Sequence, residues 1–226
     1  MDLKERLRQL SSISKTPTAS TKEGEGGGDL KGRLDRLLRS EKVYRKRELF
    51  PIDKLVDGKV VSTPEGETFQ AEEYFPSNFR YGEMTLTEIL DIPTYPAHLL
   101  SRDDRLKELD FRKALFLDTE TTGLSGGTGT FAFMVGLGFF QGDGFVVHQL
   151  FMRDYSEERA SLSILQEILD SFQFLVTFNG RHYDIPLLET RFILSRKRSK
   201  IREIPNFDLL YPSRKIWKGA YENCRL

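Results

Sequence analysis

The 226-residue sequence lacks several features that would assign it to a simple class of protein. It has one cysteine, Cys224, which excludes an internal disulfide framework and a cysteine-based zinc site. Lys and Arg together number 34, as do Asp and Glu, so net charge gives no argument for a nucleic-acid partner. No apolar run approaches the roughly 18 residues of a membrane span, and the charged N-terminus lacks the apolar core of a secretory signal. We therefore expect a cytoplasmic protein without a membrane partner.

Charge is nevertheless segregated along the chain. Residues 1–47 carry 13 basic and 7 acidic side chains, whereas residues 48–110 carry 6 and 14. We expect residues 1–40 to form a flexible basic tail, because a Ser/Thr/Gly-rich stretch there separates two short leucine-containing segments. The helical spacing of these leucines suits docking on a protein partner or on nucleic acid. The alternative is a helix too short to be stable alone.

The rest of the sequence predicts an accessory region over 41–110 and an α/β domain over 111–226. In the first, residues 59–62 and 67–70 flank a turn at 63–66 and read as a hairpin. In the second, three strands form a meander and are followed by alternating helices and strands, which is typical of a mixed sheet. The expected strands are 114–117, 131–140, 145–152 and 174–178, and the expected helices begin near 156 and 185.

A pair of carboxylates follows the first strand of the α/β domain. In ALFLDTETTG, residues 114–123, Asp118 and Glu120 are two positions apart and project from the same strand face near its carboxyl end. Two adjacent carboxylates repel unless a cation neutralises both, and a hard ion such as Mg²⁺ or Mn²⁺ prefers oxygen ligands. The alternative is a strand that runs into an acidic, solvated turn.

A second polar group follows the strand at 174–178. Asn179 and Asp184 come directly after it, within FNGRHYDIP. Asn179-Gly180 alone suits a hairpin turn, but the helical leucine pattern that follows argues against a returning strand. Asp184 alone is also explained as a helix N-cap, with Pro186 in the first turn.

Together the two stretches resemble motifs I and II of the DEDD 3′–5′ exonuclease superfamily, whose members have a ribonuclease H-like fold. The Gly-rich loop after residue 123 and the ending from residue 207 are similar to bacterial YprB-type ribonuclease H-like proteins. The resemblance covers residues 111–226 and implies a ribonuclease H-like mixed sheet. The matching residues are Asp118, Glu120, Thr121 and Gly123 in motif I, and Asn179, Tyr183 and Asp184 in motif II.

This resemblance implies hydrolysis of phosphodiester bonds in single-stranded DNA or RNA, with two Mg²⁺ or Mn²⁺ ions as cofactors. Asp118, Glu120 and Asp184 correspond to the catalytic and metal-binding carboxylates. Three further side chains are expected to contact substrate, namely Thr121, Asn179 and Tyr183.

The family's motif III, which adds a fourth acid and a Tyr or His, has no match after Asp184. His98 and Asp103 have one of its spacings but precede motif I. We therefore expect a domain that is incomplete at its C-terminus, and a chain that is impaired in catalysis by itself.

Two further residues are candidates for supporting roles. Asp208 lies in a short segment at 206–210, in a strand-end position comparable to those above, and suits either an acid behind the metal ligands or a helix cap. Arg191 begins a basic run that ends at Arg202. We expect Arg191 and this run to contact a phosphate backbone. The alternative for this run is a solvated helix end, where cations favour the helix dipole.

Two other functions fit parts of the pattern. A non-catalytic nucleic-acid-binding or scaffold protein would keep the fold without the full site. A phosphatase with an aspartyl nucleophile would use the DTETT stretch but would leave motif II unexplained.

Overall fold

The computed structural model describes residues 51–101, 103–123 and 128–221. The expected basic tail over 1–40, with its possible protein-docking segments, lies outside the described residues, as do residues 124–127 of the Gly-rich loop and Cys224. Phe50–Leu226 form one compact unit. The role of residues 41–110 as an accessory region stays a prediction.

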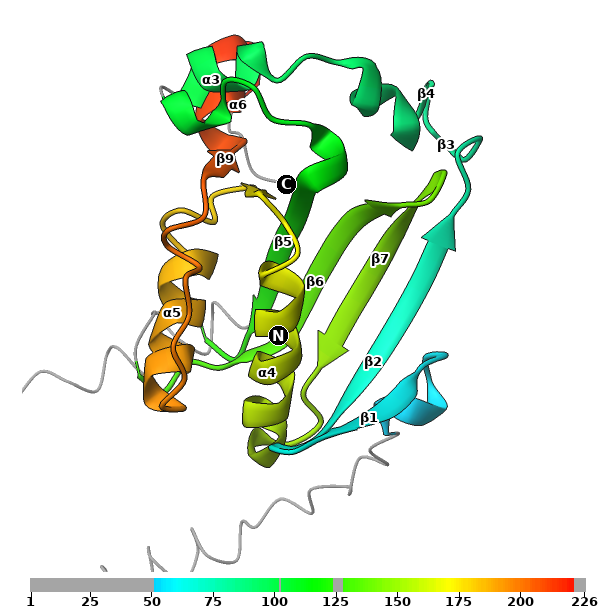
Figure 1. The fold of residues 1–226 in the computed structure, drawn as a ribbon, viewed down its shortest axis with the longest axis vertical. Coiled ribbons are helices and arrows are strands. Elements are labelled where there is room, and N and C mark those ends of the chain that lie inside the picture. The colour runs from blue at the N-terminus through cyan, green and yellow to red at the C-terminus, as the bar shows by residue number, and fades with distance from the viewer. Residues whose placement is uncertain (1–50, 102, 124–127, 222–226) are drawn as a thin grey trace, which may run out of the picture. The chain divides into compact units, whose positions relative to one another are not determined.

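A seven-stranded mixed sheet runs through this unit in the order β1-β2-β7-β6-β5-β8-β9 (Figure 1). Its strands are β1 (Lys59–Thr63), β2 (Gly66–Phe75), β5 (Ala114–Thr121), β6 (Ala132–Gln141), β7 (Gly144–Phe151), β8 (Phe174–Thr177) and β9 (Asn206–Asp208). β5, β6 and β7 form an antiparallel meander, whereas β8 is parallel to β5 and β9 is parallel to β8. The predicted ribonuclease H-like mixed sheet is confirmed.

The expected hairpin widens this sheet. β2 pairs antiparallel with β7, from Phe69 opposite Phe151 to Phe75 opposite Phe145. The turn between β1 and β2 is tied to the helical side by Glu65, which lies 3.2 Å from Lys197 Nζ and 2.7 Å from a guanidinium nitrogen of Arg159. Residues 59–75 are therefore part of the same sheet as the α/β domain. A separate two-stranded ribbon follows, made of β3 (Arg80–Tyr81) and β4 (Met84–Thr85).

Two helices, α4 (Glu158–Leu169) and α5 (Asp184–Leu194), cover one face of the sheet (Figure 1). Their leucines recur at helical spacing and meet the inward side chains of β5, β6, β7 and β8, which removes this apolar surface from water. The largest fully buried side chains of this core are Leu115, Leu137, Leu150, Leu165, Leu169, Leu175, Leu188, Phe192 and Ile201.

A smaller core surrounds α3 (Tyr95–Ser101), which lies against β9 and α6 (Leu210–Ile216). α3 ends at Ser101, and the carboxylate of Asp103 accepts the backbone N–H of Arg105 to cap a separate helical turn. Within the described ranges, no helix is long and apolar enough to cross a membrane. The 3-10 turns are η1 (Ile52–Lys54), η2 (Leu86–Asp91), η3 (Asp104–Leu106), η4 (Phe111–Lys113) and η5 (Tyr155–Glu157).

Candidate active site

Asp118 and Glu120 are exposed and share one face of β5, as the spacing predicts. The alternate positions Leu115 and Leu117 face the core under α4 and α5. Opposite Asp118 on β6 lies Gly136, where an added Cβ would meet only the Asp118 carbonyl oxygen, at 3.8 Å. The neighbouring strand therefore leaves room beside the Asp118 side chain.

Asp184 reaches the end of β5 from another element. It is the first residue of α5 and is only 3% exposed. Its Oδ1 accepts a 2.5 Å hydrogen bond from the hydroxyl of Thr119, the residue between Asp118 and Glu120. The structure thus joins motif I to motif II through a direct side-chain contact.

The environment of Asp184 opposes its negative charge. Burial is the main cause that raises the pKa of this carboxyl to about 6, and the charge of Asp118 adds to the rise. The Thr119 hydroxyl acts in the opposite direction, because it stabilises the ionised form. The charge of Asp118 therefore disfavours the ionised form of Asp184, and a bound cation would offset this effect.

The loop from β8 to α5 is held by Asp208, which is 2% exposed. Its carboxylate accepts the backbone N–H groups of Asn179 at 2.8 Å, Arg181 at 2.9 Å and Leu210 at 3.1 Å. Asp208 therefore supports the motif II loop and the start of α6 at once.

The Asn-Gly pair of this loop has a steric reason. Asn179 has a φ of 65°, a left-handed conformation that asparagine tolerates better than most residues. A Cβ on Gly180 would lie 2.5 Å from the Cβ of Thr177, so only glycine fits there. The tight turn lets the loop leave β8 and enter α5 within a few residues.

Tyr183 and Thr121 connect the two motifs a second time. Their hydroxyl oxygens lie 3.1 Å apart, and each is 3.1 Å from the carbonyl oxygen of Gly123. This cluster fixes the end of β5 against the start of α5. Contact of Thr121, Asn179 and Tyr183 with substrate stays a prediction.

Arg191 has an internal role, which corrects its expected contact with substrate. It is 4% exposed and forms a two-pronged ion pair with Glu158, with N–O distances of 2.5 and 2.8 Å. Its third guanidinium nitrogen donates to the Thr128 carbonyl at 2.8 Å, and the group lies 3.7 Å from the centre of the Phe131 ring. All three nitrogens of the guanidinium serve the packing of α5 against α4 and residues 128–131.

The candidate carboxylates do not form a ready-made metal cluster. Among residues 51–101, 103–123 and 128–221, no three His, Cys, Asp or Glu side chains are placed to hold a metal ion. Their chemistry nevertheless fits Mg²⁺ or Mn²⁺, because carboxylate oxygens are the ligands these ions prefer. The ligand roles of Asp118, Glu120 and Asp184 therefore stay predictions.

Thr119 is the residue of this site that sequence reasoning missed. It occupies the variable position of Asp-x-Glu, and alternation along the strand turns it away from the two acids. The same alternation places Thr119 on the face of β5 against which α5 packs. Strand alternation could therefore have indicated its contact with α5.

The class of the protein follows from the fold and a family comparison. A family model described as the RNase_H superfamily matches residues 115–226. This part of the chain, with its mixed sheet, is similar to the ribonuclease H superfamily, whose nucleases generally use divalent metal ions. The match agrees with the mixed sheet in assigning a ribonuclease H-like fold to these residues.

A more specific similarity is to the uncharacterized protein YprB of Bacillus subtilis (strain 168). The two are 34% identical over 158 residues, which make up 69% of this chain and 38% of the relative. The expected similarity to YprB-type proteins is thus confirmed. The chain spans well under half the length of this relative.

Proposed function

We propose that this chain is a metal-dependent 3′–5′ exonuclease domain that hydrolyses single-stranded DNA or RNA. The observation that carries the proposal is the hydrogen bond between buried Asp184 and Thr119, the residue between Asp118 and Glu120, which joins the two motifs at the carboxyl ends of the parallel strands β5 and β8. An open α/β sheet binds its ligands at this edge.

Asp118, Glu120 and Asp184 would hold two Mg²⁺ or Mn²⁺ ions. Such ions, when bound, supply an activated water and stabilise the leaving 3′ oxygen. Asp184 would contribute its charge from a buried position that Thr119 keeps oriented. Thr121, Tyr183 and Asn179 border the site and would orient the strand beside it.

We also propose that this chain alone is impaired in catalysis. Residues 185–226 contain neither Tyr-x-x-x-Asp nor His-x-x-x-x-Asp, so they do not provide the fourth acid of the family pattern. A two-metal site that is short of one carboxylate has less negative charge with which to bind its cations. We expect slow hydrolysis that is stronger with Mn²⁺ than with Mg²⁺.

The test is hydrolysis of single strands carrying a label at the 5′ end. Progressive shortening from the 3′ end, dependent on added metal, is the expected result. Asp118→Asn should abolish it, whereas Glu108→Gln, an exposed acid outside the site, should not change it. Hydrolysis that persists in Asp118→Asn, or cleavage of a circular single strand, would contradict the proposal.

A second candidate function is nucleic-acid binding without catalysis. It is favoured by the lack of a three-ligand metal group among the described residues. Binding of single strands that weakens with salt, without turnover in Mn²⁺, would support it over the nuclease.

A further inference from the structure

A polar cavity of about 600 Å³ lies next to the motif II loop. Its walls come from the first turn of α5, the residues leading into β9, and the segment between α3 and η3. Three arginines line it, Arg105, Arg181 and Arg202, together with Asn206 and the acids Asp103 and Asp104. The accessory region thus contributes directly to a wall beside the candidate active site.

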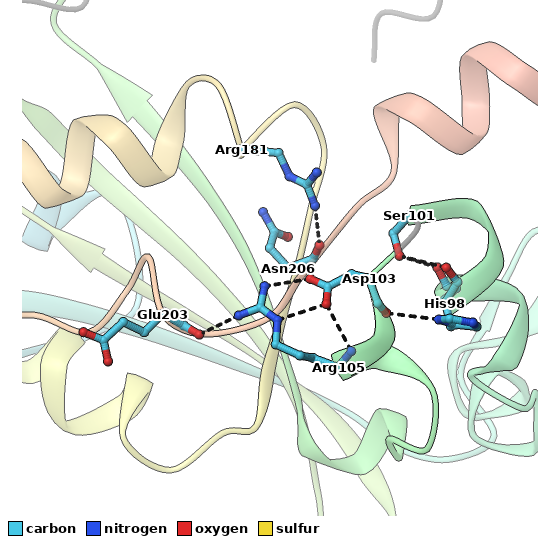
Figure 2. Close-up of polar contacts among 8 residues, drawn as sticks. His98, Ser101, Asp103, Arg105, Arg181, Glu203 and Asn206 are labelled. Carbon is cyan, nitrogen blue, oxygen red and sulfur yellow. Dashed lines mark hydrogen bonds and ion pairs between the residues drawn. The ribbon is translucent and has the colours of Figure 1, made fainter.

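Two of the three arginines are already paired. Arg105 donates from Nε at 2.9 Å and from a terminal nitrogen at 2.7 Å to the carboxylate of Asp103, and its other terminal nitrogen donates to the Glu203 carbonyl (Figure 2). This contact lowers the pKa of Asp103, which stays ionised. Arg202 forms an ion pair with Glu189.

Arg181 is differently placed. Within the described part of the chain, its guanidinium makes one hydrogen bond, from a terminal nitrogen to the Asn206 carbonyl at 3.2 Å (Figure 2). The other N–H groups of the Arg181 guanidinium are therefore available to a ligand. This guanidinium lies 5.8 Å from the centre of the Tyr211 ring. Its backbone N–H is held by Asp208, so the side chain starts from a fixed point three residues before Asp184.

Asn206 supplies a second donor. The residue is 6% exposed, and its Oδ1 accepts the Thr177 hydroxyl at 3.1 Å. Its Nδ2 is buried and has no hydrogen-bond partner among the described residues. Asn206 lines the cavity, and buried donors are nearly always satisfied, so its unpaired amide nitrogen points to an acceptor supplied by a ligand.

We propose that Arg181 and Asn206 bind a phosphate group in this cavity, and that it belongs to the nucleic-acid strand held at Asp118, Glu120 and Asp184. The inference rests on the proposed function. A planar guanidinium with free donors matches phosphate oxygens in two-pronged geometry, and the amide adds a neutral donor. Asp103 and Asp104 offset much of the positive charge of the cavity arginines. The remaining charge suits one phosphate rather than a continuous run of phosphates.

The same chemistry would accept a free phosphate or the terminal phosphate of a released nucleotide. The test therefore follows the Asn206 side-chain amide signals by NMR in the full chain, with EDTA to prevent turnover. Separate titrations use inorganic phosphate and a short single-stranded oligonucleotide. We expect the oligonucleotide to shift these signals at concentrations at which inorganic phosphate does not.

Fluorescence anisotropy of the same oligonucleotide tests Arg181. Arg181→Ala should weaken binding about tenfold and reduce the slope of log affinity against log salt by about 0.7, the value for one phosphate on a single strand. Arg181→Lys should recover only part of the affinity, because it keeps the charge without the planar fork. Arg214→Ala, an exposed arginine on α6, is the matched control and should change neither quantity.

Equal effects of Arg181→Ala and Arg214→Ala, or unmoved Asn206 signals, would overturn the inference. A shift produced equally by inorganic phosphate would overturn the assignment to a strand and favour a site for small phosphates. Failure of the proposed function is separate: metal-dependent hydrolysis would then survive Asp118→Asn, whatever Arg181 does.

Discussion

Asp184 and Asp208 are both almost fully buried near the carboxyl ends of neighbouring strands, yet their surroundings differ. Asp208 accepts three backbone N–H groups, which pair its charge. Asp184 accepts the Thr119 hydroxyl, and its pKa rises to about 6 because of burial and the nearby charge of Asp118. A buried carboxylate whose oxygens accept several hydrogen bonds stabilises the fold. A buried carboxylate with few such partners lowers the stability of the fold and is typical of a functional site.

Arg191 and Glu158 belong with Asp208 in this comparison. Their buried ion pair is satisfied on both sides and fixes α5 against α4. We call Asp208, Arg191 and Glu158 the supporting group, and Asp118, Glu120 and Asp184 the candidate carboxylates. Substitutions in the first should destabilise the fold, and some in the second should stabilise it.

The largest effect is expected at Arg191. Arg191→Ala leaves Glu158 charged and poorly solvated, because the Glu158 side chain is only 14% exposed. Removing one partner of a buried pair costs about 3–5 kcal/mol, measurable by urea unfolding. Arg202→Ala, which breaks the more exposed pair with Glu189, should cost less than about 1 kcal/mol. Equal losses for both variants would remove Arg191 from the supporting group.

Asp208→Ala should follow, with a loss of about 3 kcal/mol in the free energy of unfolding, because three N–H groups lose their acceptor. Asp208→Asn keeps one side-chain oxygen and should lose less. Urea unfolding of both variants gives the measurement. A loss for Asp208→Ala that is no larger than for an exposed aspartate such as Asp104 would contradict the role assigned to it.

Asp184→Asn should increase the free energy of unfolding, the opposite of the two substitutions above. The pKa of Asp184 rises from 3.8 to about 6 on folding, which corresponds to about 2–3 kcal/mol. Because the folded form holds its proton more tightly, the wild-type chain loses stability as pH increases from about 4 to about 6. The asparagine variant should be more stable at pH 7 and about equal below pH 4.

Urea unfolding at a series of pH values checks this prediction. If Asp184→Asn proves less stable than the wild type at pH 7, the carboxylate is better compensated than its surroundings indicate. Asp184 would then resemble Asp208, and the comparison between them would fail.

The smallest effect is expected at Asp118. Asp118→Asn should lower the pKa of Asp184 while leaving it above its ordinary value, because burial is the larger cause and persists. NMR titration of the Asp184 carboxyl carbon measures the change, with Glu108→Gln as the control. An unchanged titration would place Asp118 too far away to act with Asp184.

Much of the fold was predictable because its signals are local. Apolar runs marked β6 and β7, and leucines at helical spacing marked α4 and α5. The pairing of β2 with β7 was not predicted, because contacting residues such as Thr68 and Phe151 are 83 positions apart. No local pattern in the sequence of β2 indicates which strand it pairs with.

The candidate site was predictable where one strand carries it and not where several elements meet. The shared face of Asp118 and Glu120 follows from strand alternation. The misassignment of Arg191 arose because a cation in a basic run looks exposed, while its burial depends on Glu158 and Phe131 from other elements. Arg181 was missed for the same reason, since its neighbour Asn206 is brought to it by the order of the strands.

The β1–β2 hairpin also has a consequence for how the chain reaches its folded state. During synthesis β2 emerges well before β7, its only partner apart from β1 in the sheet. A lone two-stranded hairpin is marginally stable in water, and an unpaired strand edge invites association with other chains. Completion of the sheet therefore requires a distant segment, and we expect the pairing of β2 with β7 to be slow and exposed to aggregation.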